Sequence, residues 1–261
     1  MTEKGTRRIS VLLQSPETDR PLLELLGVLA AQPHSSIVGL FLEDINLLRL
    51  GEFPAARELC RVTFTQRRLE TGEIQRQLRV RARTVQRALE ATALKAGAEW
   101  AFRTARGTLA SLLAEAARET DLLIVGAAPR ALPRPLDLSL VSVARRAAGP
   151  IMALFDGSAP SERAVALATQ LASGRARRLI VYCVTTGEQD VSALRARLKE
   201  HLGDRRAEVR CAEGPGIEPL LEAARSESAS LLVLADSAAL WEPAAVRALA
   251  QHLDCPAVVV R

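Results

Sequence analysis

The stretch "IMALFDGSAPSERAVALATQLA", Ile151–Ala172, decides how this chain of 261 residues is organised. The apolar run Ile151–Phe155 predicts a buried strand, and Asp156, Gly157 and Ser158 follow it with residues that favour a turn. The proline and the Ser-x-Arg that come next open a pattern typical of a helix. A strand, a turn and a helix in this order begin an α/β unit, so a second unit starts just past the middle of the chain.

Outward from this stretch, short apolar runs alternate with longer helical patterns. Such alternation predicts β-α-β units and a mostly parallel sheet. In the first half, strands are predicted at Arg8–Leu13, Ser36–Leu42, Ala98–Arg103 and Asp121–Ala127. In the second half, they are predicted at Ile151–Phe155, Arg178–Val184, Ala207–Ala212, Ser230–Ala235 and Ala257–Val260. The two halves therefore follow the same plan.

An internal repeat supports this plan. "EAARETDLLIVGA" (Glu115–Ala127) matches "EAARSESASLLVLA" (Glu222–Ala235), and in both copies a helix end runs into a buried strand. We therefore predict two tandem domains, residues 1–148 and residues 149–261.

Three segments carry a resemblance to a known family. "ALFDGSAPSERAVALATQLA" (Ala153–Ala172) resembles the opening strand, turn and first helix of the universal stress protein family. The C-terminal "LDCPAVVVR" is similar to the closing strand of that family, and Gly39–Glu58, "GLFLEDINLLRLGEFPAARE", resembles the segment after strand two in its larger bacterial members. The resemblance covers nearly the whole chain as a tandem pair.

The resemblance implies an α/β fold of the adenine nucleotide alpha hydrolase-like type. Each domain would have an open parallel sheet of five strands in the order 3-2-1-4-5, with helices on both faces, and the two domains would pack as a pseudo-dimer. The segment "GPIMALFDGS" departs from this scheme, because it provides one strand where a tandem pair needs two. We therefore expect the first domain to lack its fifth strand or to borrow an edge elsewhere.

The resemblance also implies where a nucleotide would bind. Members that bind ATP use an aspartate after strand one and, after strand four, a loop G-x-x-G, nine residues, then Gly-Ser or Gly-Thr around the phosphates. Glycines let the backbone approach a ligand, and N–H groups at a helix start donate to an anion. In the first half Gly126 is present, but Pro129 replaces the second glycine, Gln14 replaces the aspartate, and the closing pair falls on Ser139 or, with a gap, near Ser142.

The second half has the reverse defect. Asp156, Gly157 and Ser158 match the turn after strand one, but no glycine lies in "ADSAALWEPAAVRALAQHLDCP" after strand four. We therefore do not expect ATP to bind in the family's usual mode, and Asp156 is interpreted first as a turn former that caps the start of the next helix and second as a ligand contact. Candidate nucleotide-binding residues are Gly126, Ser139, Ser142, Asp156, Gly157 and Ser158. The alternatives are an adenine nucleotide as a regulatory ligand, bound in the first half, and a weak ATPase.

A long helical region is predicted at residues 55–100, with arginines interleaved with apolar residues at helical spacing. A solvated face accounts for this pattern. The alternative is a surface that docks an acidic protein, a nucleic acid or an anionic membrane, with a protein partner bound through Arg76, Arg79, Arg83 and Arg87. Nucleic acid is not expected, because aromatic residues make up only 3% of the chain and provide few platforms for base stacking.

The remaining features narrow the functional class. The four cysteines form no C-x-x-C pair and are expected to be buried thiols, and with three histidines no metal site or catalytic triad is predicted. We find neither a signal peptide nor a transmembrane segment, and so expect a cytoplasmic protein. The last strand leaves an edge that a homo-oligomer could use or that could be covered within the pseudo-dimer. Together with these features, the resemblance to universal stress proteins implies a stress-response or regulatory binding module that is not an enzyme and needs no cofactor.

Overall fold

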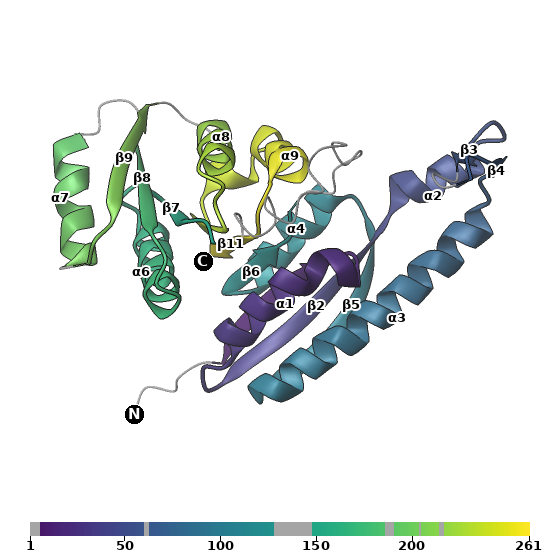
Figure 1. The fold of residues 1–261 in the computed structure, drawn as a ribbon, viewed down its shortest axis with the longest axis horizontal. Coiled ribbons are helices and arrows are strands. Elements are labelled where there is room, and N and C mark those ends of the chain that lie inside the picture. Colours follow the sequence, from purple (N-terminus) through teal and green to yellow (C-terminus); the bar gives the residue numbers. More distant parts are fainter. Residues whose placement is uncertain (1–5, 60–62, 128–147, 186–190, 204, 214–216) are drawn as a thin grey trace. The chain divides into compact units, whose positions relative to one another are not determined.

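The computed structural model describes residues 6–59, 63–127, 148–185, 191–203, 205–213 and 217–261. The chain divides into two compact units, Met1–Ala116 and Ala117–Arg261, and each is considered by itself. Both are built from mostly parallel strands with helices packed against them, which confirms the predicted α/β class (Figure 1). The predicted domain boundary at residue 148 follows the internal repeat and differs from this division into compact units. It remains a prediction.

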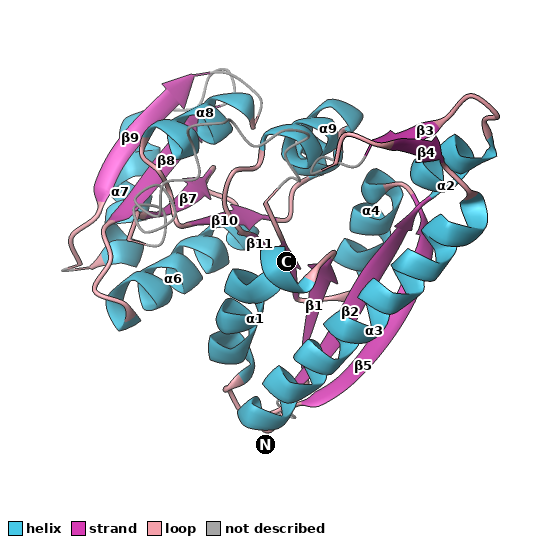
Figure 2. Ribbon diagram, turned by 45° about the vertical axis from the view of Figure 1, so that its right-hand side comes forward, coloured by secondary structure: helices cyan, strands magenta, loops and turns pink. Residues whose placement is uncertain are grey.

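The first unit contains a parallel sheet with the order β5-β2-β1. Its elements in chain order are β1 (Arg7–Leu13), α1 (Pro16–Ala30), β2 (Ser35–Asp44), α2 (Ile45–Glu52), β3 (Arg57–Leu59), β4 (Gln66–Arg68), α3 (Thr71–Ala96) and β5 (Glu99–Gly107), followed by most of α4 (Leu109–Glu119). The three predicted strands of this unit are confirmed. α1 and α3 lie side by side over one face of the sheet (Figure 2).

The predicted helical region at residues 55–100 is partly wrong. α3 begins only at Thr71, and the residues before it form a separate antiparallel hairpin, β3–β4. The cause is the position of the apolar residues: the buried face of α3 starts at Ile74 and continues with Leu78, which pack with Phe41 and Leu48 in one cluster. Before α3, Leu59 and Phe64 are exposed and Leu69 packs only partly against this cluster, so little apolar burial would hold these residues in a helix.

The second unit contains a larger sheet with the order β6-β11-β10-β7-β8-β9. Its elements are β6 (Leu122–Val125), β7 (Ile151–Phe155), α6 (Ala159–Gly174), β8 (Leu179–Thr185), α7 (Val191–Leu202), β9 (Glu208–Glu213), α8 (Glu218–Ser226), β10 (Leu231–Ala235), the short 3-10 helix η1 (Ala238–Trp241), α9 (Pro243–His252) and β11 (Ala257–Val260). All five predicted strands of the second half are confirmed, and they follow the implied order 3-2-1-4-5 from β9 to β11.

The strand β7 acts only as strand one of the second half, because β10 and β8 flank it in parallel on its two sides. The fourth strand of the first half, β6, instead lies antiparallel beside the last strand of the chain, with Val125 opposite Ala257. The first half therefore borrows an edge, one of the two expected solutions. β11 has neighbours on both sides, so its edge is covered within the chain, the second of the two expected possibilities, and a homo-oligomer stays a prediction.

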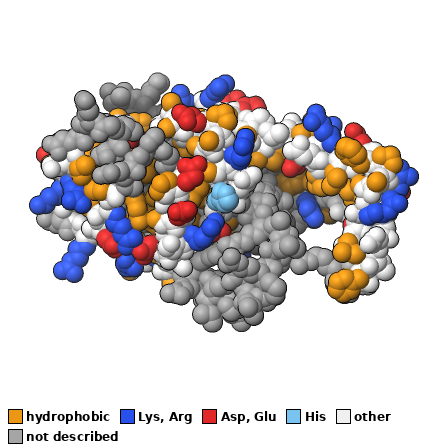
Figure 3. Space-filling view, turned by 90° about the horizontal axis from the view of Figure 1, so that it is seen from above, with side chains coloured by type: hydrophobic (Ala, Val, Ile, Leu, Met, Phe, Trp, Pro, Cys, Tyr) orange, Lys and Arg blue, Asp and Glu red, His pale blue; other side chains and the backbone are white. Residues whose placement is uncertain are grey.

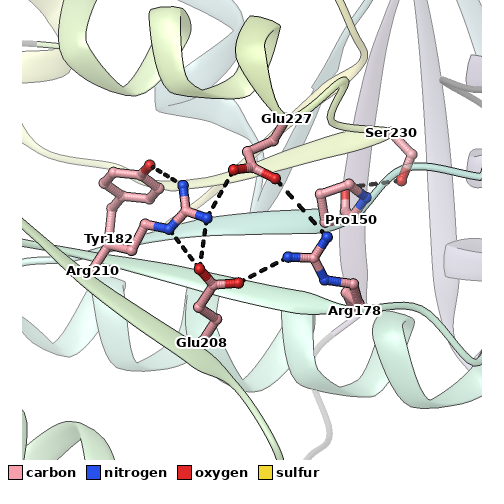
Figure 4. Close-up of polar contacts among 7 residues, drawn as sticks. All are labelled: Pro150, Arg178, Tyr182, Glu208, Arg210, Glu227 and Ser230. Atoms are coloured by element: carbon pink, nitrogen blue, oxygen red, sulfur yellow. Dashed lines mark hydrogen bonds and ion pairs between the residues drawn. The ribbon is translucent and has the colours of Figure 1, made fainter.

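A charged network connects the ends of the sheet at which β8, β9 and β10 begin (Figure 4). Arg210 donates to Tyr182 and Glu208 and pairs with Glu227 at 2.8 Å, and Arg178 pairs with Glu208 at 2.8 Å. The hydrogen bonds that Arg210 donates to Glu208 and Tyr182 raise its pKa, so the guanidinium stays charged. These groups are partly exposed and lie at the amino ends of the strands, whereas α/β sheets bind ligands at the carboxyl ends.

Candidate functional site

The ligand position implied by this topology lies between β7 and β10. The chain leaves β7 toward β8 on one side, while β10 and β11 lie on the other, and open α/β sheets bind ligands beyond the carboxyl ends of strands at such a switch point. Val233 on β10 lies opposite Ala153 on β7. Asp236 and Asp156 each follow three residues later, so this register brings them to the same end of the sheet. Two carboxylates thus lie at the candidate site.

Asp156 builds the turn between β7 and α6. Its carboxylate accepts the backbone N–H of Ser158 at 2.8 Å, and its own N–H donates to the hydroxyl of Ser161. Ser158, not Asp156, is the N-cap of α6, because its hydroxyl accepts the N–H of Ser161. The contacts of Asp156 support its interpretation as a turn former, but the expectation that it caps the helix is wrong, and its role as a ligand contact stays a prediction.

The charge of Asp156 is favoured by the same contacts. Burial by itself would raise the pKa of this carboxyl, but the hydrogen bonds from Ser158 and Ser161 outweigh the burial and leave the pKa below its ordinary value. Asp156 is therefore ionised at neutral pH. A negative charge at this end of β7 suits a donor-rich ligand such as a ribose and disfavours a phosphate.

Gly157 is required at the turn for two reasons. Its φ of +80° lies in the left-handed region, and a Cβ at this position would lie 2.8 Å from Leu194 of α7. α7 therefore packs against the turn, which explains the glycine without a ligand.

The end of β10 is closed by internal hydrogen bonds. The backbone N–H of Asp236 donates to the carbonyl of Val260 at 2.7 Å, and the indole N–H of Trp241 donates to the carboxylate of Asp236. Ser237 caps the short helix η1 through its hydroxyl. A loop that wraps phosphates needs free N–H groups, and here the first one is already used within the sheet.

The turn after β1 in the first half is closed in a different way. The carboxylate of Asp19, only 3% exposed, accepts the backbone N–H groups of Gln14 and Ser15 at 2.6 and 2.8 Å. Ser15 caps α1 and receives the N–H of Thr18. An acidic side chain from α1 thus occupies donors that an anion could otherwise use.

The predicted site residues are only partly brought together. Asp156, Gly157 and Ser158 form one turn in the second unit, while Gly126 directly follows β6, half-buried, on another strand. Ser139 and Ser142 lie outside the described residues. Sequence reasoning missed Asp19 and Asp236; the signal for Asp236 was an acidic residue directly after strand four, where the family pattern has glycine.

Two carboxylates at the end of β2 have partners within their own unit. Asp44 caps α2, and Glu43 pairs with Arg106 at 3.1 Å, so these carboxylates after β2 have local roles. A cavity of about 170 Å³ lies between β2, β5 and α4, and none of its lining residues is a predicted site residue. Its lining consists of Leu40, Arg103, Thr104, Ala105, Leu112, Glu115 and Ala116.

Metal ligation and membrane crossing find no support in the described part of the chain. No three metal-binding side chains gather within the described ranges. The helices placed in the structure all lack the combination of length and apolar character that crossing a bilayer requires. The expectation of buried thiols holds for Cys183 and Cys255 but is wrong for Cys211, which is exposed on β9; Cys60 lies outside the described residues.

Solved structures match this architecture. A universal stress protein from Archaeoglobus fulgidus superposes with a TM-score of 0.52 at 13% identity, covering 97% of this chain and 96% of its own. The chain has the universal stress protein fold. At this identity the likeness concerns the universal stress protein fold alone. No family model matches the sequence, and no curated protein is similar to it.

Shorter matches to the universal stress protein fold cover less than half of this chain. A universal stress protein in complex with cAMP is 23% identical over 44% of this chain and 98% of its own, with a TM-score of 0.34. A member of the universal stress protein family from Burkholderia pseudomallei is 25% identical over 43% of this chain and 96% of its own, with a TM-score of 0.32.

Proposed function

We propose that this protein is a regulatory binding module of the universal stress protein type that acts in stress response without turnover. It does not bind ATP in the mode of the family's ATP-binding members, and it needs no cofactor. The observation that carries the proposal is the closed end of β10, where Asp236 follows the strand and Trp241 is bound to its carboxylate.

Hydrogen-bond accounting supports the proposal in the second half. The N–H of Asp236 already donates to Val260, and no glycine follows it to bring further N–H groups close to a ligand. A hydrogen bond to a charged group contributes about 1.5–3 kcal/mol, so the loss of two phosphate donors costs roughly 3–6 kcal/mol. This cost corresponds to a roughly hundred- to ten-thousandfold weaker affinity.

Electrostatics act in the same direction. The carboxylates of Asp156 and Asp236 follow neighbouring strands at the same end of the sheet, and the hydrogen bonds around Asp156 favour its charged form. The phosphates of ATP would approach this pair against like charge. In the first half, Asp19 is a built-in anion that takes the donors of the turn after β1.

The experiment is to denature freshly purified full-length protein, chromatograph the supernatant for bound nucleotide, and titrate the stripped protein with ATP and Mg²⁺ by calorimetry. We expect no stoichiometric nucleotide and no heat of binding. Phosphate release from ATP should equal the rate without protein. The variant Asp236→Asn keeps the side-chain shape and removes one carboxylate charge, so it reports whether repulsion alone prevents binding.

Stoichiometric adenine nucleotide in the supernatant would contradict the proposal and establish an ATP-responsive switch. In that case Asp156→Asn would locate the ligand, because loss of nucleotide in a folded variant places it in the second half. Phosphate release above the background rate would establish a weak ATPase instead.

A further inference from the structure

The net charge of the chain originates in one segment. Residues 45–90 contain ten arginines and five glutamates, and no lysine, histidine or aspartate. This excess of five positive charges equals the net charge of the whole chain, so the rest of the sequence is neutral overall. The segment comprises α2, the hairpin β3–β4 and most of α3. A localised excess of this size points to an acidic partner for this segment.

The same segment exposes large apolar side chains. Two of the five phenylalanines of the chain, Phe53 and Phe64, are 63% and 75% exposed, whereas Phe41 and Phe155 are at most 1% exposed in the core. Phe53 ends α2, and Phe64 lies in the turn of the hairpin. With three exposed leucines they form what we call the apolar tip: Leu47, Leu50, Phe53, Leu59 and Phe64.

The apolar tip is held outward by packing behind it. Leu48 on the inner side of α2 is buried against Ile74 and Leu78 of α3. Gly51 lets the two helices approach closely, since a Cβ there would lie 2.7 Å from Ile74. The exposed side chains therefore cannot turn into the core without unpacking α2 from α3. Figure 3 shows orange and blue side chains together at the right-hand end, where Figure 1 places α2, β3 and β4.

Two arginines beside the apolar tip face each other. Arg57 of β3 pairs in register with Arg68 of β4, and Leu59 lies on the same face of the hairpin, two residues from Arg57. Like charges directly opposite each other on a hairpin are destabilising. Arg57 donates to the carbonyls of Pro54 and Ala56, and within the described residues neither arginine contacts a carboxylate. An external anion would relieve the repulsion between them.

The outer face of α3 extends this charge. Arg76, Arg79, Arg83 and Arg87 recur at spacings of three or four residues, so they share one face of the helix, opposite the buried Ile74 and Leu78. Glu73 neutralises Arg76 at the start of that face. The next three arginines are exposed without an acidic partner among the residues that the structure describes.

We propose that the apolar tip, together with Arg57 and Arg68, binds the surface of an anionic lipid bilayer. Phenylalanine and leucine insert at the boundary between head groups and acyl chains, while arginines contact the lipid phosphates. The apolar side chains project from a helix end and from a hairpin turn. A bilayer deforms around such projections and needs no complementary pocket. A folded acidic protein would need a pocket that fits them.

The test is co-sedimentation of the full-length protein with vesicles of phosphatidylcholine alone and of phosphatidylcholine mixed with phosphatidylglycerol. We expect binding only to the mixed vesicles, weakened by added salt. The double variant Phe53→Ser, Phe64→Ser should lower the partition coefficient by roughly tenfold or more. The variant Arg57→Gln, Arg68→Gln should lower it by roughly thirtyfold, since each of the two arginines near an anionic surface contributes about 1 kcal/mol.

The matched controls are exposed residues elsewhere. Val28→Ser with Leu94→Ser removes two exposed apolar side chains, and Arg205→Gln with Arg206→Gln removes two exposed charges in the second unit. Both controls should bind like the wild type. All variants change exposed side chains, and urea unfolding verifies that each one is folded.

Three results would overturn the inference. The first is the absence of binding to mixed vesicles, and the second is equal losses in the control variants. The third is binding that survives Phe53→Ser, Phe64→Ser, which would mean attraction by charge without insertion. Analytical sedimentation of the protein without vesicles tests one more outcome. If the protein is a dimer that Phe53→Ser, Phe64→Ser dissociates, a second copy covers the apolar tip and the inference is overturned.

Discussion

Asp19 accepts the backbone N–H of Ser15 at 2.8 Å through a carboxylate that is almost fully buried. The same oxygen accepts the N–H of Gln14, so one acidic side chain satisfies two donors at the turn after β1. In many α/β proteins such donors at a helix start bind an anionic ligand. Here the chain supplies its own anion.

Replacement of Asp19 by alanine should therefore leave two donors without an acceptor. We expect Asp19→Ala to lower the free energy of unfolding by about 2–3 kcal/mol, measured by urea denaturation. Sulfate should recover part of this loss, because it can enter the vacated position, and sodium chloride at equal ionic strength should not. An unchanged free energy of unfolding would show that water satisfies these donors equally well.

Asp156 provides a test by pH. Its pKa lies below the ordinary value in the folded protein, so its charged form stabilises the fold at neutral pH. This contribution is lost as the pH falls through the folded pKa. Asp156→Asn should cost about 1 kcal/mol or less at neutral pH, and the difference from the wild type should shrink below the ordinary pKa of aspartate. Urea unfolding over this pH range measures it, and a difference that grows toward acid pH would contradict the assignment.

Gly149 precedes β7 at a position where the backbone is crowded. A Cβ there would lie 1.9 Å from the carbonyl oxygen of Ser228, and a backbone atom cannot easily move aside. Gly149→Ala should lower the free energy of unfolding by about 3 kcal/mol or more. Gly174 at the end of α6 is the control, since nothing lies within 4 Å of a Cβ there. Equal effects of the two substitutions in a thermal unfolding assay would contradict the predicted clash.

The cysteines should differ in reactivity. Burial, together with the neighbouring Cys211, raises the pKa of Cys183 to about 11, whereas Cys211 itself is exposed. In a Cys60→Ser background, iodoacetamide near neutral pH should label Cys211 in the folded protein and Cys183 and Cys255 only after unfolding. Mass spectrometry of peptides measures the order. Labelling of Cys183 before Cys211 would show that the β8–β9 edge opens readily.

The end of β10 can be tested through its tryptophan. Trp241→Phe removes the indole donor to Asp236 and keeps an aromatic ring, so we expect a loss of about 1 kcal/mol in the free energy of unfolding. Asp236→Asn retains an acceptor and should cost less. A larger loss for Asp236→Asn than for Trp241→Phe would mean that the charge of Asp236 stabilises this loop through other contacts.

The sequence by itself determined the strands of the main sheets and the common plan of the two halves, but not the hairpin β3–β4. Short apolar runs such as Leu231–Ala235 predict strands in the interior of a sheet, and this strand is buried along its whole length. The segment Ile151–Ala172 carries the turn and cap residues of a strand-to-helix unit. Local patterns of this kind predict elements because each residue's preference and its burial agree. The long helix was predicted too early in the chain, since charge spacing alone does not show where a buried face begins.

Only the tertiary structure decided which groups meet. The antiparallel pairing of β6 with β11, the register that brings Asp236 to the same end as Asp156, and the capture of the Gln14 and Ser15 donors by Asp19 all depend on contacts that no local pattern encodes. The exposure of Phe53 and Phe64 is of the same kind. The physical reason is that burial and hydrogen-bond partners are properties of the packed chain, whereas a sequence pattern specifies only which face of an element is apolar.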